Sequence, residues 1–229
     1  ATYSATDCYE EALSRDPDDV RNNNAMGLWL IRKGQFAKAE PYLRRAVKTL
    51  TEKNPNPYDG EPLYNLGLSL KYQGKTDEAY DCFYKACWNA AWQDAGYYSL
   101  AQLSASKGNW EDALYEIDKS LLRNWHNLRG RHLKAIVLRH LGRVDEALAL
   151  IRESLAIDRF NFGCSFEEYL LTGEKAVLDD LLVRMRSEGH NYEELSLDYA
   201  SAGCFEEALK GLFRNAHCCI IIKAGSCYP

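Results

Sequence analysis

The chain has few residues that interrupt helices and no long apolar run. Six of its 229 residues are proline, and four of these stand at positions 41, 55, 57 and 62, so long stretches remain open to helix formation. No apolar run reaches the roughly 18 residues that a membrane-spanning helix needs. The first residues, Ala1 to Ser4, lack the charged segment and apolar core of a signal peptide. As written, the sequence predicts no membrane association.

A surplus of basic residues is also lacking. The net charge of −5 argues against a general nucleic-acid binder, because such proteins use Lys and Arg to meet phosphates. No pair among the eight cysteines has Cys-x-x-Cys spacing, and the first five lie in helical segments, where cysteine acts as a small apolar residue. This pattern predicts free thiols in a reducing, cytoplasmic compartment.

Motifs for catalysis are missing as well. The sequence has no glycine-rich phosphate loop, no Gly-x-Ser-x-Gly elbow and no His-Glu-x-x-His pair, and its five histidines are scattered. Cys82 and Cys87 are five residues apart on one expected helix, which turns their side chains about 140° apart and disfavours a shared metal ion. We therefore predict a protein that is not an enzyme and holds neither a metal nor a cofactor.

What the sequence does contain is an internal repeat. Five segments align on a glycine followed five residues later by alanine, and they begin at Gly34, Gly74, Gly108, Gly142 and Gly203. The intervals between these glycines are 40, 34, 34 and 61 residues. A glycine at this place ends one helix in a left-handed conformation, and the next residues begin a second helix. The alanine is small because two helices cross closely there.

This pattern resembles the tetratricopeptide repeat, whose period is 34 residues. The Leu-Gly pair of that family's first helix corresponds to Met26-Gly27 and Leu66-Gly67, and becomes Leu100-Ala101 and Lys134-Ala135 in the later repeats. The small residue of the second helix corresponds to Ala46, Ala86, Ser120 and Ser154, whereas the closing proline survives only as Pro17. The resemblance implies an all-α fold, a right-handed α-solenoid of helical hairpins.

The repeat register divides the chain into five parts. Residues 1–19 supply a half repeat, the second helix only, and residues 20–161 hold four repeats with a loop insertion at 54–62. Residues 162–188 lack the signature but keep helical periodicity, so we expect a non-standard hairpin there. Residues 189–216 form a degenerate repeat, and residues 217–229 form a divergent, cysteine-rich tail that we expect to cover the last repeat.

In such arrays the first helix of each hairpin lines a concave groove, and the register assigns the residues that face it. Cations outnumber carboxylates at these positions, and tyrosines and amides accompany them. Arg and Tyr are frequent binding hot spots, so the groove is expected to favour an extended, acidic ligand. The competing interpretation is that these side chains are only solvated or pack between helices. The predicted partner-binding residues are Asn24, Tyr64, Asn65, Lys71, Tyr72, Tyr98, Gln102, Arg129, His132 and Arg139.

The favoured function is therefore a protein–protein interaction scaffold that binds a protein or peptide. A weaker resemblance, carried by the loop at 54–62 and by the Tyr64-Asn65-Leu66-Gly67 and Ala90-Ala91-Trp92-Gln93 segments, is to the repeat-containing end of large bacterial proteins with a carbohydrate-related domain. It implies an accessory helical module as a first alternative. Self-assembly of the chain into homo-oligomers through its terminal repeats is the second.

Overall fold

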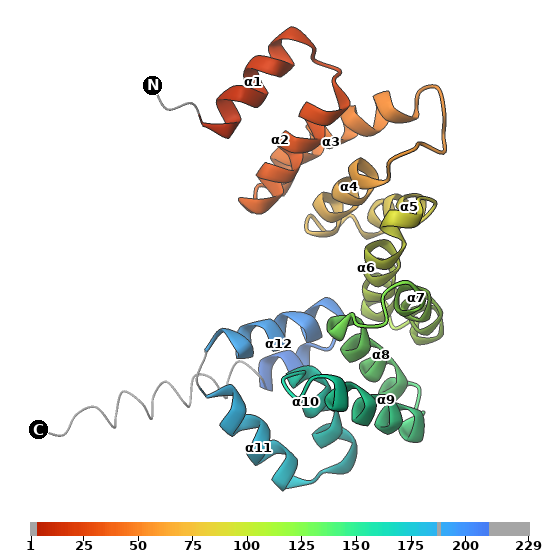
Figure 1. Ribbon diagram of the computed structural model, residues 1–229, viewed down its shortest axis with the longest axis vertical. Helices are drawn as coiled ribbons and strands as arrows, with labels where there is room; N and C mark the ends of the chain where they lie inside the picture. Colours follow the sequence, from red (N-terminus) through yellow and green to blue (C-terminus); the bar gives the residue numbers. More distant parts are fainter. Residues whose placement is uncertain (1–3, 187–188, 211–229) are drawn as a thin grey trace, which may run out of the picture. The chain divides into compact units, whose positions relative to one another are not determined.

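The computed structural model describes residues 4–186 and 189–210, and these residues form helices and turns without a β-strand (Figure 1). This confirms the predicted all-α class of helical hairpins. The chain divides into two compact units, residues 1–100 and 101–229, which are described separately below. The tail predicted to cover the last repeat lies outside the described residues.

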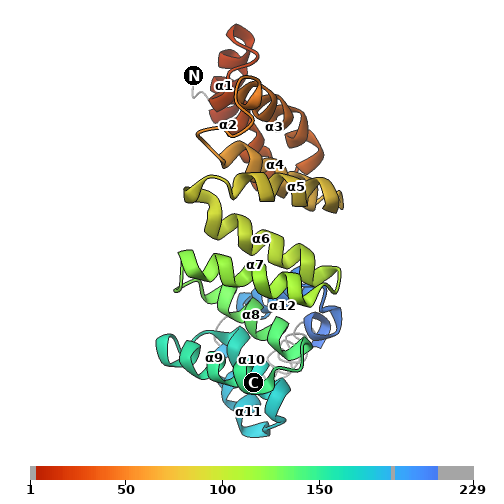
Figure 2. The same cartoon turned by 90° about the vertical axis from the view of Figure 1, so that its right-hand side faces the viewer.

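The first unit consists of a single helix followed by two hairpins. Helix α1 (Ala5–Arg15) precedes α2 (Val20–Arg32) and α3 (Phe36–Thr51), and α4 (Glu61–Lys71) pairs with α5 (Thr76–Ala86). The short 3-10 helix η1 (Ala90–Trp92) then leads into α6 (Gln93–Ser106), which crosses the boundary between the units. The two helices of each hairpin lie side by side, as Figure 2 shows for α2 and α3.

The second unit contains a single helix, two hairpins and a later helix that returns to the first of these hairpins. Its helices after α6 are α7 (Trp110–Arg123), α8 (Leu128–His140), α9 (Val144–Ile157), α10 (Phe162–Thr172), α11 (Lys175–Met185) and α12 (His190–Ser201). Helix α8 pairs with α9, and α10 pairs with α11. Helix α12 lies against α8 and α10 (Figure 1). Residues 205–210 begin a further helical segment.

The turn glycines behave as the sequence predicts. All five have φ between 69° and 79°, the left-handed region that side chains other than glycine rarely adopt. Gly173 has φ 70° and ends α10 in the same way, although its surroundings lack the repeat signature. The hairpin of α10 and α11 therefore uses the same turn chemistry as the regular repeats.

The close crossing of paired helices explains the small residues within them. A Cβ atom built on Gly67 of α4 would lie 2.6 Å from Cε1 of Phe83 on α5, so only glycine fits there. On the second helices, the small residues at the same repeat position are completely buried; they are Ala46, Ala86, Ser120 and Ser154. Small residues thus let the apolar faces meet and form the core of each unit.

Candidate functional site

On the first unit, the predicted inner face is built from α2 and α4. Asn24 and Asn65, 41 residues apart in sequence, are joined by a buried hydrogen bond in which Asn65 Nδ2 donates to Asn24 Oδ1 at 2.9 Å. Beyond this bond, the pair has the amide N–H groups of Asn24 as donors and Oδ1 of Asn65 as an acceptor. This pair is therefore a polar contact that links two successive first helices.

Aromatic side chains adjoin this pair. The ring of Tyr64 is half-buried between Phe83 and Trp92, with ring centroids 5.5 and 5.0 Å away. Tyr72, at the end of α4, is 58% exposed and stacks on Phe36 at 4.7 Å. Tyr64 therefore supports the hairpin, whereas Tyr72 presents most of its ring to solvent. Lys71 and Tyr98 are half-buried.

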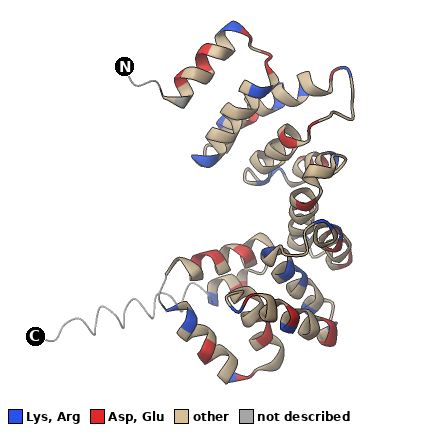
Figure 3. Cartoon of the chain, in the orientation of Figure 1, with Lys and Arg blue, Asp and Glu red and all other residues tan. Residues whose placement is uncertain are grey.

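In the second unit, the predicted residues of α8 meet α12. The guanidinium group of Arg129 pairs with the carboxylate of Asp198, and Nδ1 of His132 lies 3.7 Å from the other oxygen of that carboxylate. Burial opposes ionisation of Asp198, but its bonds with His132 and Arg129 outweigh this effect and lower its pKa. Figure 3 shows the acidic residues along α12 and the basic residues of α8.

His132 itself is enclosed. It is 2% exposed, its ring meets that of Tyr199 edge to face at 5.0 Å, and a Cβ atom on Gly163 would lie 2.3 Å from it. Glycine at position 163 thus lets α10 approach the imidazole ring. The structure makes His132 part of the packing between α8, α10 and α12.

Arg139 is held by a second acidic contact. Its Nε and Nη2 atoms donate to both oxygens of Glu167 on α10, at 2.7 and 3.2 Å, and Nη2 lies 3.2 Å from Glu207. Tyr199 of α12 donates to the same completely buried Glu167 at 2.7 Å. Burial disfavours the charge of Arg139, but the bonds to Glu167 outweigh it, so its pKa is raised.

These contacts show what sequence reasoning missed. Three of the ten predicted residues, Arg129, His132 and Arg139, are engaged by acidic or aromatic groups of the same chain. Gln102 is 6% exposed. Glu167 lies in the segment without the repeat signature and Asp198 in the degenerate last repeat, so the repeat register offers no indication that either carboxylate reaches α8.

The side chains of Cys204 and His140 lie close together in the second unit. Cys204 Sγ lies 3.4 Å from Nε2 of His140, a geometry compatible with a nucleophile and its base. Burial raises the pKa of Cys204 to about 12, so the thiol stays protonated at neutral pH. The ring of His140 stacks on Trp110 at 4.0 Å, and burial lowers its pKa. The pair therefore lacks the thiolate that nucleophilic chemistry requires.

Within residues 4–186 and 189–210, no three His, Cys, Asp or Glu side chains gather into a metal-binding cluster. No helix in the same ranges is both long and apolar enough to cross a membrane.

Successive hairpins turned by left-handed glycines and joined through small buried residues define a helical-repeat protein. Models of the tetratricopeptide repeat match residues 60–87 and 98–162. Human tetratricopeptide repeat protein 7A is 37% identical over 82 residues, which are 36% of this chain and 9% of that protein. The chain therefore contains tetratricopeptide repeats in these two ranges, and it spans only a small part of that human relative.

Solved structures share the fold. MamA aligns with a TM-score of 0.60 and 20% identity, over 68% of this chain and 95% of that one. A tetratricopeptide repeat protein from Parabacteroides merdae aligns with a TM-score of 0.59 and 19% identity, over 90% and 78%. YrrB, described as a TPR protein with an unusual peptide-binding site, aligns with a TM-score of 0.53 and 15% identity, over 92% and 91%.

Proposed function

We propose that this protein is an interaction scaffold without catalytic activity, and that the inner face of its first unit binds an extended, acidic segment of a partner protein. The observation that carries the proposal is the Asn24–Asn65 pair on neighbouring first helices. Side-chain amides placed along a row of helices suit an extended peptide, because each peptide unit offers one donor and one acceptor.

The groups around the pair supply the remaining chemistry. Asn65 Oδ1 accepts from a peptide N–H and Asn24 Nδ2 donates to a peptide carbonyl. Tyr72, which is 58% exposed, supplies an apolar surface, and Lys71 lies one residue before it on α4 with a cation for a carboxylate. Tyr98 on α6 stands 34 residues after Tyr64, so by the repeat register we expect it to continue this row.

The second unit supports the preference for acidic ligands. Arg129 and Arg139 of α8 are matched by Asp198 and Glu207 of the returning segment, so the chain itself places carboxylates on this face. We propose that Arg129, His132, Arg139 and Gln102 belong to a binding face of the second unit. A partner there competes with α12 or binds beside it. The first unit is accordingly the place to test.

A selection of random dodecapeptides displayed on phage, with the full chain as bait, tests the proposal. The double variant Asn65→Ala and Tyr72→Ala should weaken the selected peptides about 10-fold or more, the size expected when hot-spot residues are truncated. Tyr115→Ala, which removes a 62% exposed tyrosine on α7, is the matched control and should leave binding unchanged. If no selected peptide binds the double variant more weakly than the native chain, the proposed face is refuted.

The same protein distinguishes the alternatives. Binding on a glycan array would favour the accessory carbohydrate module. Light scattering that shows dimers or larger species would favour self-assembly.

A further inference from the structure

A cleft of about 820 Å³ opens between α1 and the hairpin of α2 and α3. It lies on a different side of α2 from the proposed inner face, because Met26 in the cleft is two residues from Asn24 and therefore about 200° around the helix. Its walls are Thr6 and Glu10 of α1, Met26 and Leu30 of α2, and Tyr42 of α3. Neither the repeat register nor the proposed function assigns a role to it.

The next junction of the same unit shows how such a cleft is normally closed. There α3 packs against α4, and the carboxylate of Glu40 bonds to Lys75 at 2.7 Å, to Gln73 at 2.9 Å and to Arg44 at 2.8 Å. Arg44 also reaches across to Glu78 of α5 at 2.6 Å. One long acidic side chain thus closes the space between α3 and the following hairpin.

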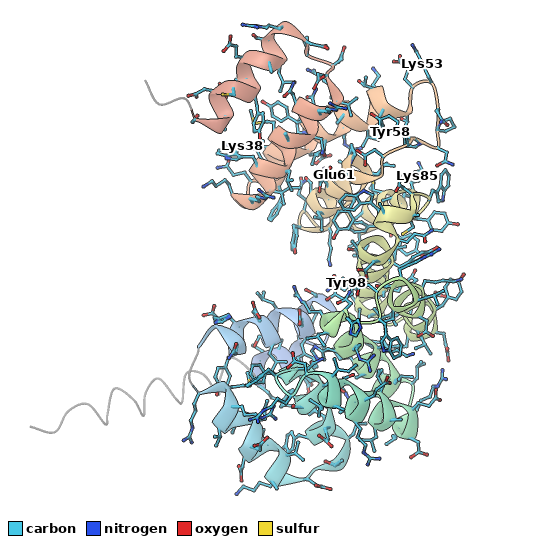
Figure 4. The ribbon with its side chains drawn as sticks, viewed as in Figure 1. Lys38, Lys53, Tyr58, Glu61, Lys85 and Tyr98 are labelled. Atoms are coloured by element: carbon cyan, nitrogen blue, oxygen red, sulfur yellow. The ribbon has the colours of Figure 1, made fainter. Side chains whose placement is uncertain are left out.

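The repeat register explains why the first junction stays open. Helix α1 corresponds to α3 at a spacing of 34 residues, which places Thr6 where Glu40 stands and Glu10 where Arg44 stands. Threonine is two heavy atoms shorter than glutamate and carries no charge. The first junction therefore has no carboxylate at position 6, where the second one has Glu40, although Glu10 of α1 supplies one elsewhere in the cleft; Gln35 and Lys38 line it as well. Figure 4 labels Lys38 on α3.

The groups that line the cleft define a ligand. Met26, Leu30 and Tyr42 offer an apolar floor. Lys38 and Arg45 carry positive charge, against the carboxylate of Glu10 in the cleft and that of Asp18, which lies 3.9 Å from Arg45.

Asn23 adds an unused acceptor. It is completely buried, and its Nδ2 atom donates to the carbonyl groups of Pro17 and Asp19 at 2.8 Å each. These two bonds fix the amide, and its Oδ1 atom accepts no hydrogen bond within the described residues. A buried acceptor without a donor is costly, so a ligand that supplies an N–H at this point gains affinity.

We propose that this cleft is a second peptide-binding site, which takes a partner segment carrying a carboxylate within about one helical turn of an apolar side chain. The carboxylate lies between Gln35 and Lys38, where it replaces the missing side chain at position 6. The apolar side chain lies on Met26 and Tyr42, and a backbone N–H of the segment donates to Asn23.

Filling the cleft from within tests this site. Thr6→Glu restores the acid found at the equivalent position of α3, and Thr6→Gln is the matched control of equal length without the charge. Peptides of the dodecapeptide selection that bind the cleft should lose at least 10-fold in affinity on Thr6→Glu and on Lys38→Glu. They should keep most of their affinity on Thr6→Gln, because a neutral amide does not repel their carboxylate.

Binding in the cleft can be tested separately from binding to the proposed inner face. Peptides that occupy the cleft should bind the double variant Asn65→Ala and Tyr72→Ala as they bind the native chain. Circular dichroism of each variant shows whether the helices are retained. If no selected peptide distinguishes Thr6→Glu from Thr6→Gln, or if Lys38→Glu binds as tightly as the native chain, the cleft is not a peptide site.

Discussion

Replacing Gly67 by alanine measures how closely the two helices of a repeat approach. A Cβ atom at this position would lie 2.6 Å from Cε1 and 2.7 Å from Cδ1 of Phe83. Ordinary carbon contacts begin near 3.5 Å, so the ring has to move by about 1 Å. Phe83 is completely buried and also packs on Tyr64, which leaves it little room to move.

Two opposing effects set the change in the free energy of unfolding that Gly67→Ala causes. Alanine in a helix interior is favoured over glycine by about 1 kcal/mol, whereas overpacking a core costs about 1–3 kcal/mol. We expect the overpacking to exceed the propensity gain, because the clash is with a buried aromatic ring. Gly67→Ala should therefore lower the free energy of unfolding of the first unit by about 1–2 kcal/mol.

The later repeats indicate a second substitution that should relieve this clash. At the corresponding places in later repeats, Ala101 stands with Ile117 and Ala135 with Ile151. The double variant Gly67→Ala with Phe83→Ile should accordingly be more stable than the sum of its single variants predicts, by about 1 kcal/mol.

Urea denaturation followed by circular dichroism measures the free energy. Hydrogen exchange of α4 and α5 locates the change, because the two units need not unfold together. Gly74→Ala is the matched control. It has no neighbour within 4 Å but has φ +77°, so it should lose stability through backbone strain, and Phe83→Ile should not relieve that loss. A Gly67→Ala chain at least as stable as the native one would refute the close-crossing argument.

Three further predictions concern charge and burial. Burial raises the pKa of Glu40, but its bonds to Lys75, Arg44 and Gln73 outweigh this and lower it from 4.5 to about 2, so the ionised Glu40 stabilises the fold above pH 4.5. This contribution, roughly 1–3 kcal/mol after screening, should be lost as the pH falls from 4.5 to 2. The variant Glu40→Gln should not show this loss. Glu167→Gln should cost the second unit about 3–5 kcal/mol in urea denaturation by breaking its buried ion pair, and Tyr199→Phe only about 1 kcal/mol; equal losses would contradict the ion-pair argument. Iodoacetamide at pH 8 with mass spectrometry should modify exposed Cys8 in the native protein and buried Cys164, whose pKa burial raises to about 12, only after unfolding; early modification of Cys164 would contradict its burial.

In the second unit, arginine residues that the register predicts to bind a partner instead pair with carboxylates of the same chain. A guanidinium group lined up along a first helix is suited to capture a partner's carboxylate. In α8 the same groups capture carboxylates of α10 and of the segment that begins with α12. A ligand that binds α8 here therefore has to interact with it more strongly than Asp198, Tyr199 and Glu207 do.

The sequence by itself determined the repeat and its turns. The period of glycines, the small residues at the crossing points and the apolar spacing are local patterns, and each depends on one helix or one turn. The left-handed glycines are a clear case, because other residues rarely adopt that conformation. The same register also placed Asn24 and Asn65 on one face, and the structure joins them by a hydrogen bond.

Only the tertiary structure decided which of the predicted side chains remain available. The path of α12 back onto α8 follows from how its tyrosines and acids fit against α10, and such contacts join residues 32 to 69 positions apart. The open cleft beside α1 likewise depends on the absence of one long side chain at a junction between helices. Contacts between distant segments carry no periodic pattern, so the amino-acid order alone does not reveal them.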